Sequence, residues 1–465
     1  MTAMTDPVAL RDRVAELLTE YRIPSAAVGI LHHGRVTGFA TGVTDVRTGA
    51  PATVETVYQC GSMTKTWTAL AFLRMADEGR VSLDEPVRTY LPAFRVADPS
   101  VSAAVTPRHL LNHTNGIEES YGDAGEDEDV YARMVAAIAD APQVFPLGHT
   151  HGYSAALGYA ILARIMEVAD GAPWHEILRR RVFEPLGQTG TDCLPAEADA
   201  DRAATGHILR SFDEGPIVSP IPYLPRAFGP GGAVSSTVRD VLSMAHIFLA
   251  DGRAPDGTRM LSPHMLREMT DSRVPVPDPY MFGPEWALGL IICDWHGETV
   301  YATDGTTIGQ NARLRILPGH DLAVAVLTNC GPRESFARKV FQTILPEFGA
   351  PAPPELPAPD PLLRLDPGRY TGVYGRPGGH YEVSADGERL RLAFVTDPER
   401  AGLLGTPDRI EYDLLPVSET HFLLPARNAL EDTQTLALYD FSEGRARYLH
   451  TNCRVNPRIA DRVPG

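Results

Sequence analysis

The sequence predicts an α+β protein in which an antiparallel sheet is flanked by helices and followed by a small antiparallel β-barrel or sandwich. Residues 7–43 read as one helix and then two strands, which is how a helix-covered antiparallel sheet begins. Residues 286–348 hold three strand-like runs and a closing helix. Residues 369–455 alternate as short strands with turn signals between them, the pattern of a small all-β domain.

The first elements are an amphipathic helix and a hairpin. Residues 7–22 place their apolar side chains on one side of a helix, namely Val8, Leu10, Val14, Leu17 and Leu18. The runs AAVGILHH and VTGFATGV follow, with a turn at Gly34 between them. We therefore expect these segments to begin the sheet and to place a helix on it.

The stretch VYQCGSMTKTWTALAFLRMA (57–76) carries the first chemical motif. An apolar lead-in reaches Gly61, and Ser62 then opens a segment whose apolar residues recur at helical spacing. Ser62 and Lys65 stand three apart, so they share one face of that helix. At the start of a helix, free backbone N–H groups and the helix dipole favour developing negative charge. The pair therefore suits a serine nucleophile that is assisted by a lysine.

Lysine is scarce in this chain, which makes the pair more informative. Of the 42 basic residues only Lys65 and Lys339 are lysine, so the other 40 are arginine. A desolvated lysine can lose its proton and act as a general base, whereas an arginine cannot. The alternative is a serine that caps the helix, followed by a solvated lysine.

A second motif precedes a long apolar helix in the middle of the chain. TPRHLLNHTNGI (106–117) reads as a short capped helix that ends at Asn115–Gly116. A glycine-rich turn then leads to Tyr153, Ser154 and Ala155, after which the apolar helix begins. A tyrosine at such a turn is either a functional phenol or a packing residue.

A third motif lies among the last strands of the sheet. The strand-like runs are WALGLIICDW (286–295), ARLRILP (312–318) and LAVAVLTNC (322–330). Between them, VYATDGTTIGQN contains Gly305 and Gly309, which permit a close backbone approach. After a closing helix, GAPAPPELPAPDP (349–361) is a Pro/Ala-rich linker, stiff rather than helical. We assign residues 1–348 to a first domain, 349–366 to the linker and 367–465 to the barrel domain.

Composition narrows the classes of function. The net charge is 42 − 59 = −17 and no basic block occurs, which argues against nucleic acid or an anionic membrane surface as a partner. The charged, amphipathic N-terminus is unlike a signal peptide, and no segment approaches a membrane span. We therefore expect a cytoplasmic protein.

Neither the cysteines nor the histidines predict a metal site. The five cysteines lack metal-type spacing and read as reduced core residues. They are Cys60, Cys193, Cys293, Cys330 and Cys453. His109, His113, His149 and His151 have spacings that would suit a metal, but no carboxylate stands at a matching helical position. We expect capping or packing roles for them, with no metal and no cofactor.

Several ordered motifs resemble those of one family. Ser62-x-x-Lys65, Tyr153–Ser154 and the TDG run at 303–305 occur in the order and approximate separation found in serine β-lactamases and penicillin-binding proteins. The segments IPSAAVGIL, LLNHTNGI, PLGHTHGYS, GGAVSSTVRD and ALGL resemble the class C β-lactamase and esterase branch. The likeness covers residues 7–347. It implies a β-lactamase-like sheet flanked by helices and an all-helical subdomain.

The second half of the resemblance concerns the C-terminal region. Residues 369–455 resemble the lipocalin-like barrel that some relatives carry. The whole layout is similar to penicillin-binding-protein-type thioesterases, which release and cyclise nonribosomal peptides. This likeness implies that residues 1–348 are a catalytic domain.

The resemblance also implies a role for each motif residue. Ser62 would be the nucleophile, and Lys65 and Tyr153 would remove its proton and deliver it to the leaving group. The backbone N–H groups of Ser62 and Thr306 would form the oxyanion hole.

The substrate-binding positions that the resemblance implies are Ala155, Thr303, Asp304 and Gly305. Ala155 replaces the asparagine of a Tyr-x-Asn motif, so an amide that would bridge the lysine and the substrate is missing. Thr303 stands where a lysine or histidine is usual, so recognition of a substrate carboxylate and efficient β-lactam hydrolysis are less expected. Asp304 could bond an incoming amine or form a turn.

Three functions stay open. The first is a serine acyl-enzyme hydrolase or acyltransferase acting on peptide-like thioesters, esters or amides, including a thioesterase or cyclase that releases a nonribosomal peptide. The second is a cytoplasmic esterase or D-amino-acid peptidase on the same scaffold. The third is a non-catalytic binding or sensor protein. The expected partner is a small-molecule or peptide acyl substrate, free or linked to a carrier protein, with no nucleic acid and no membrane.

Overall fold

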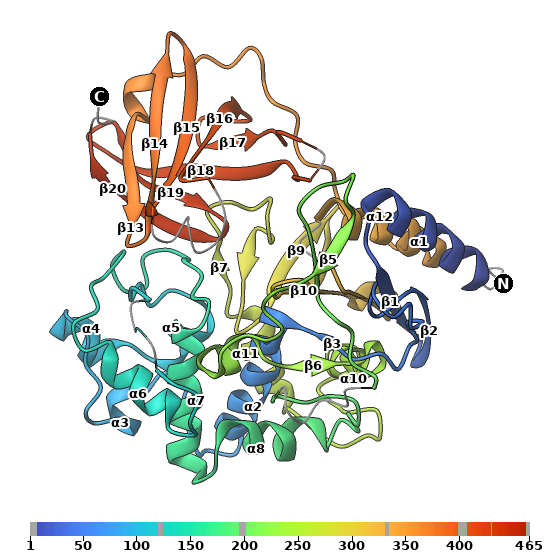
Figure 1. Cartoon of the computed structure of the whole chain (residues 1–465). Helices are drawn as coiled ribbons and strands as arrows, with labels where there is room; N and C mark the ends of the chain where they lie inside the picture. Colours follow the sequence, from blue (N-terminus) through green and yellow to red (C-terminus); the bar gives the residue numbers. More distant parts are fainter. Residues whose placement is uncertain are drawn as a thin grey trace.

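An eight-stranded antiparallel sheet and a separate barrel dominate the computed structural model, which describes residues 7–119, 122, 124–194, 201–330, 334–398, 407–428 and 430–461. Figure 1 shows the barrel above two parts, one built on the sheet and one made of helices. The predicted fold class is confirmed, because helices flank the antiparallel sheet and a closed antiparallel barrel follows it.

The main sheet runs in the order β2-β1-β12-β11-β10-β9-β8-β7. Its strands are β1 (Ser25–His32), β2 (Arg35–Gly42), β7 (Val274–Pro275), β8 (Glu285–Trp286), β9 (Ile291–Trp295), β10 (Glu298–Thr306), β11 (Asn311–Leu317) and β12 (Leu322–Thr328). The first and last long strands of this region are neighbours, since β1 pairs with β12. The middle of the chain, which contains most of the helices, is therefore inserted between them.

Each face of the sheet has its own helical cover. The covering helices are α1 (Pro7–Tyr21), α2 (Thr64–Asp77), α10 (Val238–Leu249) and α12 (Glu334–Ile344). Ala26 and Val28 of β1 share a hydrophobic core with α1 and α12. Ala27 and Leu31 face the opposite way, into a core that includes α2 and α10. The period-two alternation of a strand thus divides the interior into two layers.

The all-helical part surrounds α2. It is composed of α3 (Val87–Tyr90), α4 (Pro99–Ala104), α5 (Pro107–Leu111), α6 (Val130–Ala137), α7 (Leu157–Asp170), α8 (Trp174–Leu178), α9 (Gly229–Gly232) and α11 (Pro263–Asp271). The prediction for 106–117 was wrong at its end, because α5 stops at Leu111. His113 then adopts a left-handed φ of 59°, which no α-helix can continue through.

Two short ribbons complete the first part. One joins β3 (Tyr58–Gln59) to β6 (Ser235–Ser236), and the other joins β4 (His207–Leu209) to β5 (Pro216–Val218). In the described residues no helix is long and apolar enough to cross a bilayer.

The C-terminal region closes into a barrel of eight strands. They are β13 (Gly372–Arg376), β14 (Gly379–Asp386), β15 (Arg389–Thr396), β16 (Arg409–Pro416), β17 (His421–Leu424), β18 (Gln434–Ser442), β19 (Arg445–Thr451) and β20 (Arg454–Ala460). The region predicted to form short strands, residues 369–455, ended where β20 begins. This strand closes the barrel by pairing with both β19 and β13. Its segment RVNPRIA alternates apolar and polar residues, but Pro457 in the middle weakens the strand signal.

Candidate active site

Ser62 lies in a 3₁₀ turn, Gly61–Met63, that leads directly into α2. Lys65 sits in the first turn of that helix, and its Nζ is 3.5 Å from Ser62 Oγ. The spacing of three residues therefore brings the two side chains together, and the serine hydroxyl stands at the N-terminal end of a buried helix.

Lys65 is buried, with 2% of its surface exposed. Its ammonium donates hydrogen bonds to the backbone carbonyls of Ala155, at 2.7 Å, and of Gly231, at 2.8 Å. Burial disfavours the charged form and lowers the pKa of Lys65 to about 7, while Glu119 raises it and Arg454 lowers it to smaller extents. A substantial share of this amine is therefore neutral near pH 7.

Tyr153 completes the group. The centre of its ring lies 4.8 Å from Lys65 Nζ, and its side chain is hydrogen-bonded to that of Ser62. Burial raises the pKa of the phenol, against the effect of the hydrogen bond, so Tyr153 stays protonated at neutral pH. The ring packs at centroid distances of 4.6 Å from His113 and 5.6 Å from Trp286. Of the two groups beside the serine, the lysine is thus the one able to accept a proton.

The backbone around Gly305 is packed directly against the serine turn. A Cβ placed on Gly305 would lie 1.8 Å from Cys60 O and 2.7 Å from Ser62 N, so only glycine fits there. The N–H of Thr307 bonds to Gln310 across the β10–β11 turn. Because successive N–H groups of a strand point to opposite sides, that of Thr306 points away from β11, toward the serine turn. Ser62 N–H and Thr306 N–H thus flank one site.

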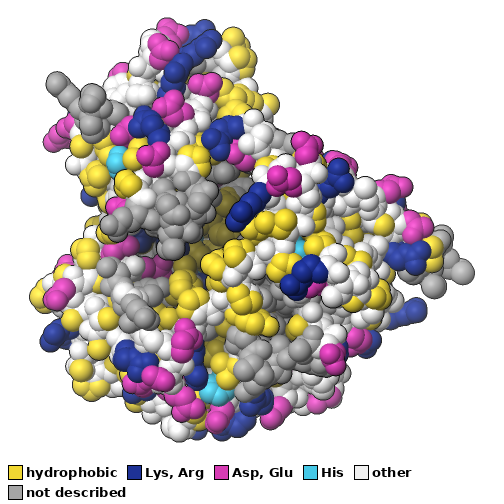
Figure 2. Space-filling view, viewed as in Figure 1, with side chains coloured by type: hydrophobic (Ala, Val, Ile, Leu, Met, Phe, Trp, Pro, Cys, Tyr) yellow, Lys and Arg dark blue, Asp and Glu magenta, His cyan; other side chains and the backbone are white. Residues whose placement is uncertain are grey.

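Strand β10 extends past its neighbour β9 at this point. On the side away from β11 it pairs with β9 only from Glu298 to Ala302. Among the described residues, 303–306 have no strand partner there; Gly305 is packed against the serine turn, and Thr306 is the exposed residue of the four. Figure 2 shows that this face of the molecule is hollowed between the barrel and the two parts below it, with hydrophobic side chains around the hollow.

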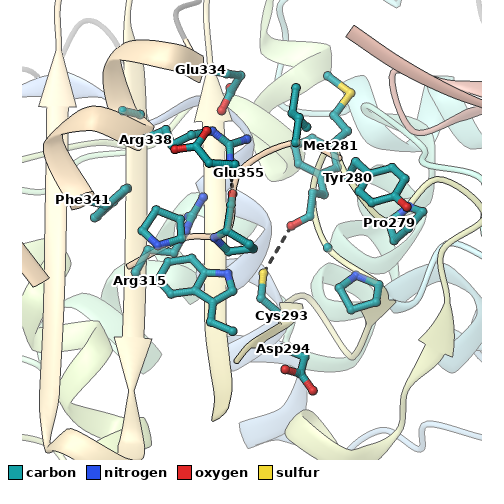
Figure 3. Close-up of a pocket in the computed structure, with 18 residues that line it drawn as sticks. Pro279, Tyr280, Met281, Cys293, Asp294, Arg315, Glu334, Arg338, Phe341 and Glu355 are labelled. Carbon is teal, nitrogen blue, oxygen red and sulfur yellow. Dashed lines mark hydrogen bonds between the residues drawn. The ribbon is translucent and has the colours of Figure 1, made fainter. Parts of the chain in front are cut away.

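Thr303 and Asp304 point to opposite faces of β10. Thr303 is buried on the α2 side, with its Oγ1 2.8 Å from Thr66 Oγ1. Asp304 lies on the α12 side, where Arg315 Nη2 donates to Asp304 Oδ2 at 3.0 Å. Figure 3 shows Arg315 with Phe341 at a cavity of about 130 Å³ on that side. Asp304 is therefore not brought together with Ser62, Lys65 and Tyr153.

Three contributors to the site had no signal in the sequence. The backbone carbonyl of Gly231 accepts a hydrogen bond from Lys65. Every residue has such a carbonyl, so the residue type could not identify this one. Glu119 accepts hydrogen bonds from the start of α7, and Arg454 of the barrel pairs with it at 2.9 Å. A glutamate in an acidic loop and an arginine far along the chain become recognisable only once the fold joins them.

The four histidines considered for a metal have other surroundings. His109 Nδ1 accepts from the Thr106 N–H in a capping box, and His149 lies 2.9 Å from Asp440. His113 and His151 are buried, and their ring centres are 5.7 Å apart. Across the described ranges, no three or more His, Cys, Asp or Glu side chains are grouped as metal ligands would be.

Comparisons with known proteins agree on one family and one fold. A family model described as Beta-lactamase matches residues 10–345. Penicillin-binding protein 4 of Amycolatopsis lactamdurans is 38% identical over 373 residues, which are 79% of this chain and 97% of that protein. Esterase EstB of Burkholderia gladioli is 32% identical over 206 residues, which are 41% of this chain and 51% of that protein.

The solved structures extend the similarity over the barrel. SurE matches with a TM-score of 0.77 and 26% identity, covering 98% of this chain and 100% of the SurE chain. A class C β-lactamase from Rhodobacter sphaeroides, at 19% identity and a TM-score of 0.59, covers 73% of this chain and shares the fold of the first part.

Proposed function

The chain belongs to the β-lactamase family of serine hydrolases, and we propose that it transfers a peptide-like acyl group through Ser62, as a thioesterase or cyclase that releases a peptide. One observation carries the proposal: Lys65 is buried, has a pKa of about 7, and lies 3.5 Å from Ser62 Oγ. An amine that is part neutral at physiological pH can activate a serine hydroxyl.

The first half-reaction follows from the positions of three side chains. Neutral Lys65 accepts the Ser62 hydroxyl proton as Oγ bonds to the acyl carbon. The oxygen of the acyl group takes up negative charge between the N–H groups of Ser62 and Thr306. When the bond to the leaving group breaks, the ammonium returns its proton to that group through the Tyr153 hydroxyl. An acyl-enzyme on Ser62 results.

The second half-reaction needs an acceptor. A water molecule gives a hydrolysed product, and an amine gives an amide, which is a ring when the amine belongs to the same peptide. In either case Lys65 deprotonates the acceptor, and Ser62 regains its proton as the ester breaks. The exposed end of β10 at Thr306, which has no strand partner from β9, supports an extended peptide as the acyl donor.

The rim of the site supports an apolar acyl group. Of the ten large apolar side chains exposed in the described residues, four belong to segments beside the serine: Ile217, Ile221, Tyr223 and Ile308. Gln59 Nε2 donates to Pro222 O at 2.6 Å, which joins this loop to the strand before the serine turn. We propose that these side chains receive an apolar part of the acyl group, because contiguous exposed apolar surface marks binding sites.

Similarity to SurE supports a D-amino acid in the substrate. SurE, which matches 97% of this chain at 26% identity, has been solved with D-Leu. We therefore propose a peptide thioester whose acyl end is an apolar D-residue, free or bound to a carrier protein.

A matched pair of substrates tests the proposal. We expect the protein to form an acyl-enzyme with an N-acylated peptidyl thioester ending in D-Leu and to consume it faster than p-nitrophenyl acetate. Ser62→Ala should form no adduct by intact mass spectrometry. A preference for the simple ester would instead favour the esterase function, which the EstB similarity supports, and no adduct with either substrate would leave only a binding role.

A further inference from the structure

One hairpin of the barrel reaches into the active site. Strands β19 and β20 are joined by Asn452 and Cys453, whose φ values of 48° and 59° give the two-residue turn that fits a twisted hairpin. Asn452 of the tip is exposed, whereas Cys453 is fully buried in the hydrophobic core that contains Tyr153. The barrel is thus in direct contact with the residue that passes the proton.

The backbone of Tyr153 is fixed by this tip. The Tyr153 N–H donates to the Cys453 carbonyl at 2.8 Å. Tyr153 lies just before the helix α7, in a loop where no strand or helix of its own would hold it. His113 of the first part holds the residues on either side, and the barrel supplies the acceptor for Tyr153 itself.

Glu119 holds the other side of the same turn. Its Oε1 accepts from the Ser154 hydroxyl at 2.8 Å and from the N–H groups of Ala156 and Leu157 at 2.9 and 3.1 Å. These bonds cap the start of α7 and orient the Ala155 carbonyl, which accepts from Lys65. A single carboxylate oxygen thus places the tyrosine turn and one of the two carbonyls that hold the lysine.

Arg454, the first residue of β20, neutralises Glu119. Arg454 Nη1 donates to Glu119 Oε2 at 2.9 Å, directly after the hairpin tip. Burial alone would raise the pKa of Glu119, but Arg454 and the hydrogen bonds bring it down to about 2. The carboxylate therefore stays ionised, and its charge partner comes from the barrel.

We propose that the β19–β20 hairpin is a working part of the active site, in which Cys453 O and the Arg454–Glu119 ion pair position Tyr153 and Lys65. Glu119 and Arg454 act through the turn and through their charges, so they are positioning residues. This inference rests on the proposed function of Ser62 and Lys65.

The charges around Lys65 make the proposal testable. The groups that face the amine are Ser62, His113, Glu119, Tyr153, Tyr159 and Arg454. Glu119 stabilises the ammonium and Arg454 destabilises it, so their removal should shift the titration of the lysine in opposite directions.

The experiment is the pH dependence of Ser62 phosphonylation by a fluorophosphonate, which releases fluoride, followed by intact mass from pH 5 to 9. In Arg454→Met we expect the acidic limb of the rate to move to higher pH, and in Glu119→Gln to lower pH. A shift of about half a pH unit changes the rate on the limb about threefold. Arg454→Lys should return the limb toward its wild-type position, because the charge is restored.

The matched control is another arginine–glutamate bridge across the same interface. Arg376 of β13 bonds to Glu118 at 2.9 Å; Glu118 accepts the backbone N–H of Glu119 at 3.0 Å, but among the described residues neither Arg376 nor Glu118 bonds to the Tyr153 turn through its side chain. Arg376→Met should leave the limb in place, with the melting temperature of every variant checked.

Three results would overturn the inference. The first is an acidic limb of the pH–rate profile that does not move in Arg454→Met and Glu119→Gln. The second is a limb that moves in the same direction in both variants, and the third is an equal shift in Arg376→Met. Each would mean that the hairpin is only a docking contact. If Arg454→Met does not fold, Arg454→Gln carries the same expectation. Failure of the wild-type protein to label at Ser62 would instead contradict the proposed function.

Discussion

Lys65 and Lys339 are the two lysines in the chain, and they differ in burial. Lys65 is buried and donates to carbonyl oxygens, whereas Lys339 on α12 is partly exposed and pairs with Glu20 at 2.6 Å. Because burial disfavours the ammonium, only Lys65 has a pKa lowered to about 7. The chemical role follows from this loss of solvation rather than from the amine itself.

Replacing each lysine by arginine separates charge from proton transfer. Lys65→Arg keeps a positive charge but removes a group that can be deprotonated, so acylation of Ser62 should slow on the order of 10²–10⁴-fold. Lys339→Arg is the control and should leave the rate unchanged. Stopped-flow or quench measurement of the acylation rate checks both, and a fast Lys65→Arg variant would contradict the role of the amine.

Two tyrosines beside Lys65 form a second matched pair. Tyr153→Phe removes the hydroxyl near Ser62 but keeps the ring packed against His113, so we expect kcat to fall about 10²-fold or more with little loss of stability. Tyr159→Phe removes a hydroxyl that donates to Leu111 O, at 3.3 Å, and should change kcat only slightly. Equal losses in both variants would argue for a packing role. Steady-state kinetics and melting temperatures of both variants distinguish the catalytic role from the packing role.

Single residues were predictable where spacing along one helix sets the geometry. Ser62 and Lys65 meet because three residues make about one helical turn. Asp304 shows the limit of such reasoning. Its place beside the glycine motif suggested substrate contact, but the alternation of β10 turns it toward Arg315. Which side chains of a strand point toward the site is set by how the strand is placed in the sheet, so the sequence of the strand alone does not predict it.

The contact between β10 and the serine turn is the closest backbone approach near the site. A methyl group on Gly305 would have to displace Cys60 O, which lies 1.8 Å from its position, and would move the N–H groups on either side. We expect Gly305→Ala to lower kcat by about 10²-fold or more, since each oxyanion-hole donor contributes about 3 kcal/mol. Gly319→Ala, whose nearest contact is at 3.7 Å, should be neutral. Kinetics with circular dichroism tests both.

Secondary structure was predictable where periodicity is strong and failed where it is weak. The runs of β1 and β12 are largely apolar and that of β11 alternates, and all three were located within a residue or two of their bounds. Strand β20 was missed, because Pro457 in the middle of its short alternating run argues against a strand. Pairing with β19 and β13 holds this strand in place, and such pairing can be known only from the tertiary structure. The arginine that reaches Glu119 lies on this missed strand.

The interface between the barrel and the first part also buries three histidines. His113, His151 and His450 are fully buried, with ring centres 5.7 and 6.1 Å apart along the series. Burial lowers all three pKa values, that of His151 to about 3. The folded protein therefore holds neutral rings that the unfolded chain would protonate below pH 6.5.

Stability should consequently fall in acid. The contribution of each neutral ring is complete above about pH 6.5 and is lost as the pH drops toward the folded-state value, at up to ~1.4 kcal/mol per pH unit for each histidine. We expect urea unfolding midpoints to decline between pH 7 and pH 5. His151→Phe should flatten that decline, whereas the exposed His264→Gln should not. A midpoint independent of pH over this range would contradict the burial.

The central claim is that a buried amine with a pKa near 7 turns Ser62 into a nucleophile. The most direct measurement is the rate of fluorophosphonate labelling of the wild-type protein from pH 5 to 9, with the modified residue located by peptide mass spectrometry. We predict one adduct, on Ser62, whose rate rises with pH to a plateau with a midpoint near 7. Labelling at another residue, labelling that persists in Ser62→Ala, or a rate without a midpoint in this range would contradict the account.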